Sequence, residues 1–268
     1  MKILQIIALL VTSGLCVSGC SNGDKKSDVK KEMLIYCGIT MISPMKEIAT
    51  RFEKANDCKI TLTQGGSEDL YKSLAYGKVG ELYLPGSQAY RKKHIGDGFL
   101  TDYVELGYNQ AALIVQKGNP KNISADVTLL ADGDFAAVIG NPESCSIGKQ
   151  SKKILTKLGI FDAVVNNVIL IAADSRTMNK TIIDSSADLI LNWGATAFFD
   201  ENKEYMDRLV LPESVAPKKK IQLSLLSFAR DPELARKFME YAVSVEGQEV
   251  FHRFGFLDSV SSVGEIQQ

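Results

Sequence analysis

The sequence predicts an α/β fold in which helices cover mostly parallel sheets, and it divides the chain into two lobes. Short strand and helix patterns alternate along nearly all of the chain, which is typical of parallel sheets with helices on both faces. Two longer apolar strands, expected near 108–116 and 221–229, interrupt this rhythm. Strands of this length can leave one sheet and enter another, so we expect them to be the two hinge strands between the lobes.

Short apolar or alternating runs identify the strands of the fold. In chain order, such runs predict strands at residues 33–37, 59–63, 81–84, 108–116, 135–140, 168–172, 188–193, 207–211 and 221–229. The third of these strands stops at Pro85-Gly86, a pair that favours a turn. The short strands are the ones expected to alternate with helices inside each lobe.

Apolar residues at helical spacing, together with capping residues, identify the helices. Pro44 follows Ser43 at the first helical position, Gly159 lies just past a helix end, and Asp231 precedes a helix as its cap. The predicted helices begin at Ser43, Ser67, Gln88, Ser146, Thr177, Pro232 and Glu246.

The N-terminus has the pattern of an exported lipoprotein. A basic residue precedes a short apolar run at 3–11, and the small residues that follow end in Val17-Ser18-Gly19-Cys20, which resembles the bacterial lipid-attachment motif. The run is too short to cross a bilayer, which takes about 20 residues. We therefore expect a signal peptide at 1–19 and a lipid-anchored tether at 20–32, with the lipid on Cys20.

The rest of the chain divides at the two hinge strands. We expect lobe 1 to comprise residues 33–110 and 222–258, lobe 2 residues 111–221, and a flexible tail residues 259–268. The chain has 31 basic and 32 acidic residues, a balance that provides no strongly basic face for a nucleic-acid backbone. No nucleic-acid partner is expected, and the protein is expected to be a monomer.

Three junctions in the chain pass from a strand through a Gly/Ser/Thr turn into a helix. They lie at 34–44, 60–67 and 138–148. Each places free backbone N–H groups and small hydroxyls at the start of a helix, where unpaired donors and the helix dipole both favour an anion. Two such clusters that face each other would form a cleft for a small anion.

The cysteines and the absence of catalytic motifs argue against an enzyme. Cys37 and Cys58 are expected at opposite ends of neighbouring strands, on the order of 13 Å apart, which is too far for a disulfide. The chain contains no phosphate-binding loop motif, no zinc-protease motif and no Cys-x-x-Cys pair. We expect a binding protein without metal or cofactor, and a nucleophilic Cys37 or Cys145 is the enzymatic alternative.

Several segments together resemble a known family. In order and spacing, they resemble bacterial periplasmic solute-binding proteins, nearest to the molybdate/tungstate-binding branch of the type II oxyanion binders. This resemblance implies a two-lobed Venus-flytrap fold and delivery of a small tetrahedral oxyanion to ABC permease subunits in the inner membrane. The segments that carry it are 34–40, 45–53, 66–70, 81–87, 140–144, 238–242 and 246–251.

The same resemblance implies a set of ligand-binding residues. It assigns oxyanion contacts to Thr40, Gly66, Ser67, Ser144, Ser146, Ile147, Arg176 and Trp193. Two of these depart from the family pattern, because Arg176 brings a fixed charge and the Trp193 indole can donate one hydrogen bond but accept none. Asp174, an acceptor close to Arg176, could select a protonated anion. The alternatives are therefore a phosphate- or sulfate-binding protein of the same fold, or a sensory lipoprotein without transport.

Overall fold

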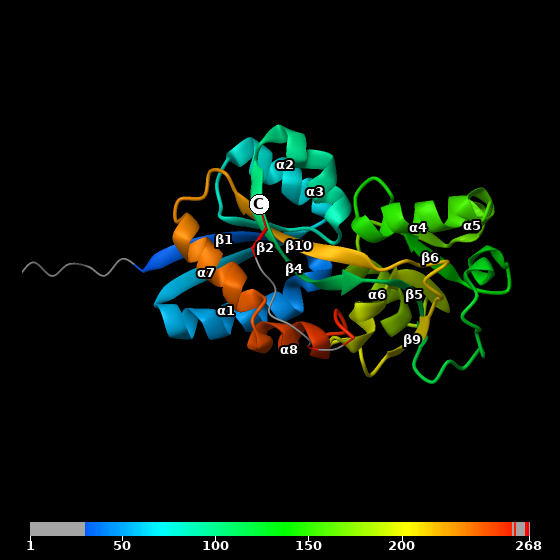
Figure 1. The fold of residues 1–268 in the computed structure, drawn as a ribbon. Helices are drawn as coiled ribbons and strands as arrows, with labels where there is room; N and C mark the ends of the chain where they lie inside the picture. The colour runs from blue at the N-terminus through cyan, green and yellow to red at the C-terminus, as the bar shows by residue number, and fades with distance from the viewer. Residues whose placement is uncertain (1–29, 259, 261–265, 268) are drawn as a thin grey trace, which may run out of the picture.

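The structure, a computed structural model, describes residues 30–258, 260, 266 and 267. The predicted signal peptide, Cys20 and most of the predicted tether lie outside the described residues. Figure 1 shows two lobes side by side, each built on one five-stranded sheet. Within the described part of the chain, no helix is both long and apolar enough to cross a membrane.

Sheet A forms the first lobe and combines parallel and antiparallel strands. Strand β1 pairs in parallel with β2 and β3, whereas β10 pairs antiparallel with β3 and β4. Its strands, in spatial order, are β2 (Cys58–Gly65), β1 (Lys31–Gly38), β3 (Leu82–Leu84), β10 (Lys219–Leu226) and β4 (Leu100–Asn109).

Sheet B forms the second lobe and repeats the same plan. Strand β6 pairs in parallel with β7 and β8, whereas β5 pairs antiparallel with β8 and β9. Its strands, in spatial order, are β7 (Leu170–Ala172), β6 (Ala137–Gly140), β8 (Leu189–Trp193), β5 (Ala111–Gln116) and β9 (Met206–Val210). In each sheet a single strand, β10 in sheet A and β5 in sheet B, runs against the others, so the prediction of two lobes with mostly parallel sheets is confirmed.

The chain crosses between the lobes twice. It leaves sheet A through β4 and enters sheet B through β5, with only Gln110 between the two strands. The predicted single strand at 108–116 is therefore two strands in two sheets. The chain returns after β9 along residues 211–218 and re-enters sheet A as β10. The first crossing lies within the strand predicted at 108–116, whereas the second comes before the strand predicted at 221–229.

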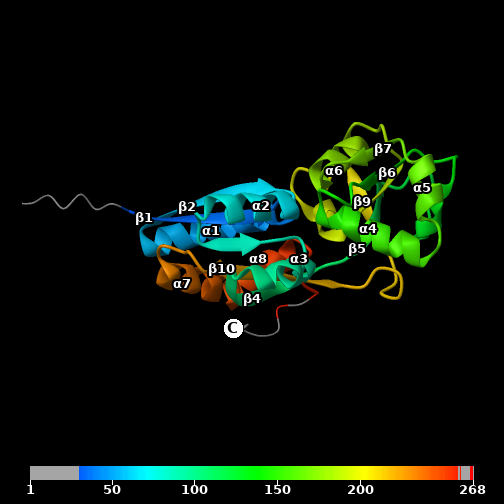
Figure 2. The ribbon, with the colours of Figure 1, turned by 90° about the horizontal axis from the view of Figure 1, so that it is seen from above.

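Helices cover both faces of sheet A (Figures 1 and 2). On one face, α1 (Ile42–Asn56), α7 (Pro232–Ala242) and α8 (Val245–Arg253) bury an apolar core that includes Phe52, Phe238 and Phe251. On the other face, α2 (Ser67–Gly77) and α3 (Gln88–His94) pack over a smaller cluster rich in tyrosine. Such packing fixes the loops that join strand ends to helix starts.

The helices of the second lobe are α4 (Ser146–Lys157), α5 (Phe161–Asn167) and α6 (Ser175–Ile183). Helices α4 and α6 each follow the carboxyl end of a parallel strand, β6 and β7 respectively. Their apolar sides, which include Ile147, Ile154 and Met178, join a separate core around sheet B. Each lobe thus has its own core.

Several element boundaries differ from the sequence predictions. A 3₁₀ turn at Ile39–Met41 follows β1, so α1 begins at Ile42 and Ser43 is not its cap. Strand β1 begins at Lys31, inside the predicted tether. Near the C-terminus, Gln267 exchanges two backbone hydrogen bonds of 2.7 Å with Tyr103 on β4, so this part of the predicted flexible tail is paired with sheet A.

Candidate functional site

The loops at the carboxyl ends of the parallel strands bring the two lobes into contact. Gly38 at the end of β1 lies opposite Gly65 at the end of β2. Thr40 and Ser67 each follow two residues later, so parallel pairing sets them on neighbouring loops at one edge of sheet A. Both side chains are buried, with 3% of Thr40 and 2% of Ser67 exposed.

Gly86, at the end of β3, is where serines from the two lobes meet. Its N–H donates to Ser67 Oγ at 3.0 Å, and its carbonyl accepts from Asn109 Nδ2 at 3.0 Å. A Cβ on Gly86 would lie 2.1 Å from Ser146 Oγ and 3.6 Å from Ser67 Oγ. Only glycine allows this approach, so Ser67 of lobe 1 and Ser146 of lobe 2 lie on either side of one small backbone segment.

The only tryptophan in the sequence forms a hydrogen bond with Ser146. Trp193, at the end of β8 and fully buried, donates its Nε1–H to Ser146 Oγ at 3.0 Å. Ser146 and Ser67 therefore each accept one N–H bond from the protein. Since a serine hydroxyl can accept and donate, both retain their own O–H proton for a further acceptor.

A second close approach joins Gly66 to the loop before α4. A Cβ on Gly66 would lie 2.6 Å from the carbonyl oxygen of Ser144. The Ser144 hydroxyl donates to the carbonyl of Ala173 at 2.9 Å, so its proton is used inside lobe 2. Ile147 stands in the first turn of α4, where backbone N–H groups have no acceptor within the helix.

Thr40 and Arg176 meet in a different part of the boundary between the lobes. They line a cavity of about 230 Å³, here called the Thr40 cavity, together with Ser175 and Asn179 of α6. Ser67 is not among its lining residues. Among the described residues, the Thr40 hydroxyl has no hydrogen-bond partner. Arg176 Nη2 donates across the boundary to Gln64 Oε1 at 3.3 Å, so the two lobes also touch here.

Asp174 is a helix cap in this structure. Its Oδ1 accepts from the backbone N–H of Thr177 at 2.8 Å at the start of α6. This bond stabilises the first turn of α6 and gives the carboxylate a structural role. The hypothesis that Asp174 selects a protonated anion gains no support from this geometry.

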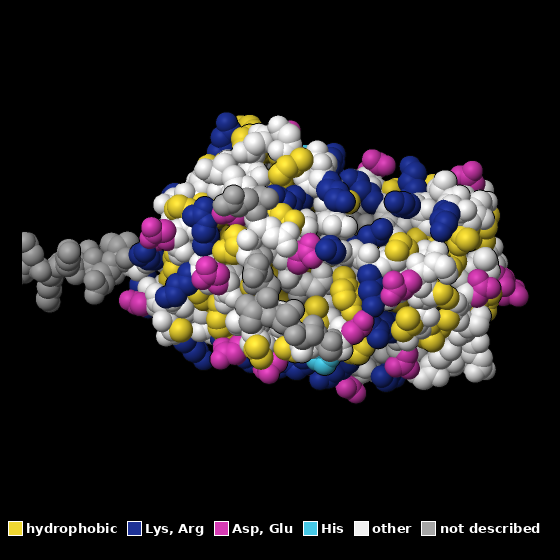
Figure 3. Space-filling model, viewed as in Figure 1, with side chains coloured by type: hydrophobic (Ala, Val, Ile, Leu, Met, Phe, Trp, Pro, Cys, Tyr) yellow, Lys and Arg dark blue, Asp and Glu magenta, His cyan; other side chains and the backbone are white. Residues whose placement is uncertain are grey.

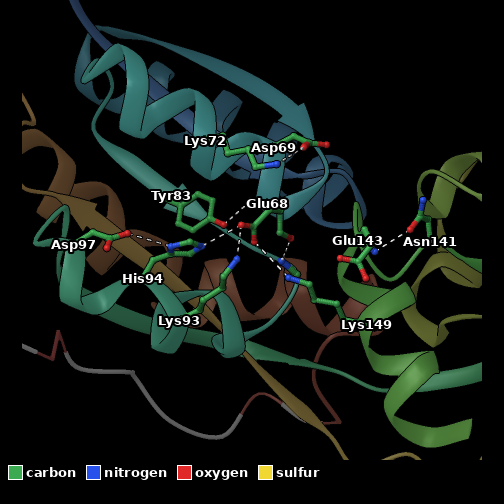
Figure 4. Close-up of polar contacts among 12 residues, drawn as sticks. Glu68, Asp69, Lys72, Tyr83, Lys93, His94, Asp97, Asn141, Glu143 and Lys149 are labelled. Carbon is green, nitrogen blue, oxygen red and sulfur yellow. Dashed lines mark hydrogen bonds and ion pairs between the residues drawn. The ribbon is translucent and has the colours of Figure 1, made fainter. Parts of the chain in front are cut away.

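The acidic residues at the start of α2 are the obvious obstacle to an anion near Ser67. Figure 4 shows that the Glu68 carboxylate points toward three cationic or titratable side chains. It is paired with Lys93, lies 3.6 Å from His94 Nε2 and lies 3.4 Å from Nζ of Lys149. Lys149 belongs to α4, so this ion pair also joins the two lobes.

The environment of Glu68 keeps it ionised. Burial raises the pKa of this carboxyl, but the hydrogen bond from Lys93 and the charges of Lys149, Lys93 and His94 outweigh burial and hold the pKa at about 2. Its neighbour Asp69 is exposed and lies 4.0 Å from Lys72. The negative charge nearest to Ser67 is thus balanced within a local ion cluster.

The three described cysteines are buried free thiols. Cys37 and Cys58 lie at opposite ends of the paired strands β1 and β2, as predicted, because Cys58 pairs with Lys31 and Cys37 with Gln64. Burial raises the pKa of Cys145 to about 11 and that of Cys37 further. Thiols that remain protonated at neutral pH are poor nucleophiles, so neither supports the enzymatic alternative.

Two α/β lobes joined by two crossings, with strand-end loops meeting between them, define the class of two-lobed solute-binding proteins. The chain belongs to the family of bacterial extracellular solute-binding proteins, whose model matches residues 33–257. It is 27% identical over 267 residues to a putative ABC transporter substrate-binding lipoprotein, YvgL, of Bacillus subtilis, covering 95% of this chain and 98% of that protein. The family is non-enzymatic, and its members lie outside the cytoplasm.

Solved structures support the same fold. The periplasmic molybdate-binding protein of Azotobacter vinelandii matches with a TM-score of 0.72 at 15% identity, covering 85% of this chain and 99% of that one. The sulfate-binding protein SubI of Mycobacterium tuberculosis matches with a TM-score of 0.76 at 16% identity, covering 84% and 86%. At 15% and 16% identity, these likenesses show the two-lobed fold of the chain.

Proposed function

We propose that the chain captures a small tetrahedral oxyanion, of the molybdate or tungstate kind, between its lobes and delivers it to the permease. The observation that supports this proposal most strongly is that Ser67 and Ser146 both lie close to Gly86. Each hydroxyl already accepts an N–H bond and has its own proton to donate, one from each lobe. An anion that accepts from both would bind the closed form more tightly than the open form and would shift the population toward it.

The other predicted residues take roles consistent with their positions. Thr40 offers a hydroxyl that has no partner in the described part of the chain, and Ile147 offers a backbone N–H at the start of α4. Arg176 provides the positive charge on the side of the Thr40 cavity. We assign Trp193 the role of orienting Ser146, because its only donor is already used there.

Gly66 and Ser144 contribute through the backbone. Their close contact lets the loop after β2 and the loop before α4 approach without side chains between them. Charge-assisted hydrogen bonds contribute roughly 1.5–3 kcal/mol each, so about five of them suffice for sub-micromolar binding. The hydroxyls of Ser67 and Ser146 and the backbone N–H groups in the first turns of α2 and α4 supply this count.

Phosphate or sulfate is the second candidate ligand. Arg176 favours it, because a guanidinium group fits tetrahedral oxyanions in general rather than one metal oxyanion. We further propose that Cys20 carries the lipid anchor, that the protein is a monomer, and that the lobes divide as the sequence predicts. The family match favours transport over a sensory role without transport.

A thermal-shift assay with four anions tests the proposed function. Molybdate, tungstate, sulfate and phosphate are added to the purified protein, and the preferred anion is expected to raise Tm by about 10 °C at 1,000 times its Kd. Thr40→Ala and Ser67→Ala are each expected to remove at least about half of that shift, because each deletes one donor to the anion.

Ser73→Ala is the matched control. Ser73 lies on α2 like Ser67, but its hydroxyl donates to the carbonyl of Asp69 on the helix surface. This variant is expected to keep the full shift. An unchanged shift in both Thr40→Ala and Ser67→Ala, or no shift with any of the four anions, would contradict the proposed function.

A further inference from the structure

A second cavity between the lobes is lined in part by Ser146 and shares no lining residue with the Thr40 cavity. It has a volume of about 290 Å³ and is here called the lysine cavity. Six of its lining residues matter below: Tyr90, Lys92, Ser146, Lys149, Lys153 and Lys219. At about 30 Å³ per water molecule, this volume corresponds to roughly ten waters, well beyond the needs of a five-atom oxyanion.

Uncompensated positive charge is the main feature of this cavity. None of the described residues that line it is acidic. Lys149 is paired with Glu68, but Lys92, Lys153 and Lys219 have no ion-pair partner among the described residues. In Figure 3, Lys and Arg side chains gather over α3 and α4, where the two lobes meet. The molecule therefore concentrates cations at the rim of the cleft despite its net charge of −1.

The pKa of Lys219 reflects the positive charges of the neighbouring lysines. It is half-buried at the start of β10, and its pKa is lowered by burial and then by the charges of Lys153 and Lys92. The three ammonium groups come from β10, α4 and α3, so three separate elements hold like charges together. A cluster of like charges of this kind attracts an anion.

Tyr90 is the aromatic residue in the wall of this cavity. It lines the lysine cavity and is only 2% exposed, yet its hydroxyl has no hydrogen-bond partner among the described residues. Burying a hydroxyl without a partner is unfavourable, so native structures rarely leave one unpaired. Nζ of Lys149 lies 4.5 Å from the centre of the Tyr90 ring, so the ring of Tyr90 and the ammonium group of Lys149 share this wall.

The cavity continues from the proposed oxyanion site along one face of α4. Ser146, Lys149 and Lys153 are separated by three and then four residues, so they share a face of the helix. At 1.5 Å per residue, this face runs roughly 10 Å from Ser146 to Lys153. A single tetrahedral oxyanion cannot reach both ends, but a short molecule with an anionic group at each end can.

We propose that the lysine cavity is a second anion subsite. This inference rests on the proposed function. The chain accepts, besides a single oxyanion, small molecules with two anionic groups of the phosphate or carboxylate class. One group binds at Ser67 and Ser146, and the other binds among Lys92, Lys153 and Lys219.

Isothermal titration calorimetry with two matched ligand pairs tests this subsite. The pairs are pyrophosphate against phosphate, and a phosphorylated hydroxy acid against the same hydroxy acid without phosphate. In the wild type, the two-group ligand of at least one pair is expected to bind about tenfold more tightly or better. The double variant Lys153→Gln/Lys219→Gln is expected to reduce that preference to about threefold or less, with the affinity for phosphate unchanged.

Lys152→Gln is the control, because Lys152 lies on α4 but does not line the cavity. It should keep the wild-type preference, and unchanged thermal unfolding of the ligand-free variants checks that they fold. No preference in either pair, or a preference that survives in the double variant, would overturn the second subsite. If the second subsite is overturned, the proposed function would still be supported when Ser67→Ala loses all binding and the lysine double variant keeps it.

Discussion

At the scale of single residues, the proposed site depends on the directions of the hydrogen bonds around Gly86. Ser67 and Ser146 are small hydroxyl residues that could equally be helix caps. The structure gives neither of them a capping hydrogen bond, and instead an N–H group donates to each. Their protons are therefore the free donors, and Gly86 is the residue that lets two lobes place them close together.

Gly86→Ala tests this arrangement. The added Cβ would lie 2.1 Å from Ser146 Oγ and 2.9 Å from Ser146 Cβ, so the lobes must move apart. Each lobe keeps its own core, so we expect Tm without ligand to change by only a few degrees. Affinity for the preferred anion, measured by calorimetry, should fall at least about tenfold, because the two serines no longer reach the same anion.

Gly77→Ala is the comparison for that variant. Gly77 ends α2, and an added Cβ there has nothing within 4 Å. The substitution should leave affinity unchanged and can raise stability slightly through a lower backbone entropy in the unfolded chain. Equal affinities of Gly86→Ala and wild type would show that close approach at Gly86 is not needed for binding.

At the scale of elements, the start of α2 has two opposing features. Its unpaired N–H groups favour an anion, but Glu68 and Asp69 add negative charge in the first turn. The fold resolves this by turning Glu68 toward Lys93, His94 and Lys149 (Figure 4). The sequence contains all four residues, but their meeting depends on how α2, α3 and α4 pack.

The pH dependence of stability in Glu68→Gln checks this ion cluster. The pKa of Glu68 is lowered to about 2 in the folded state, against roughly 4.3 unfolded. Because the pKa is lower in the folded state, the ionised carboxylate stabilises the fold at pH values above its pKa in the unfolded state. This contribution is lost as the pH falls toward 2. We expect the variant to be about 2 kcal/mol less stable at pH 7, allowing for the partly exposed lysines. The difference should shrink between about pH 5 and pH 2 in urea unfolding.

Asp69→Asn serves as the reference, because Asp69 is in the same helix turn but is exposed and only 4.0 Å from Lys72. Its stability change should stay within about 0.5 kcal/mol at every pH. A difference between wild type and Glu68→Gln that does not vary with pH would mean that the Glu68 charge is not the stabilising feature.

Most elements were predictable from local pattern, and the misses have local causes. Helix α5 escaped notice because its seven residues include β-branched valines and asparagines, and only Val164 is buried. The first part of β4 was missed because polar residues separate Leu100 from Val104. The 3₁₀ turn before α1 moved the helix start away from Ser43, a detail that depends on how Thr40 and Met41 are buried.

At the scale of the whole molecule, the site is a product of lobe closure. The family resemblance predicts Ser67 and Ser146 as ligand contacts, and both lie at the start of a helix. It does not reveal the roles of Gly86 and Asn109, because their contacts cross from one segment to another. Pro85-Gly86 follows the third parallel strand, so its place at the same sheet edge is the signal that could have pointed to it.

Long-range pairing also decided which donors are free. Trp193 and Ser144 were predicted as ligand contacts, but Trp193 donates to Ser146 and Ser144 to Ala173. Such partners become visible only when sheet B and its helices are assembled. The mixed sheets have the same origin, because the direction of β5 and β10 follows from the path of the chain between the lobes.

A crystal structure of the protein with tungstate tests the central claim most directly, because tungsten gives a strong anomalous signal at one position. The account predicts a single main peak between the lobes, with oxyanion oxygens within hydrogen-bond distance of both Ser67 Oγ and Ser146 Oγ. A tungstate ion bound outside the boundary between the lobes, or bound to only one of these two serines, would contradict it.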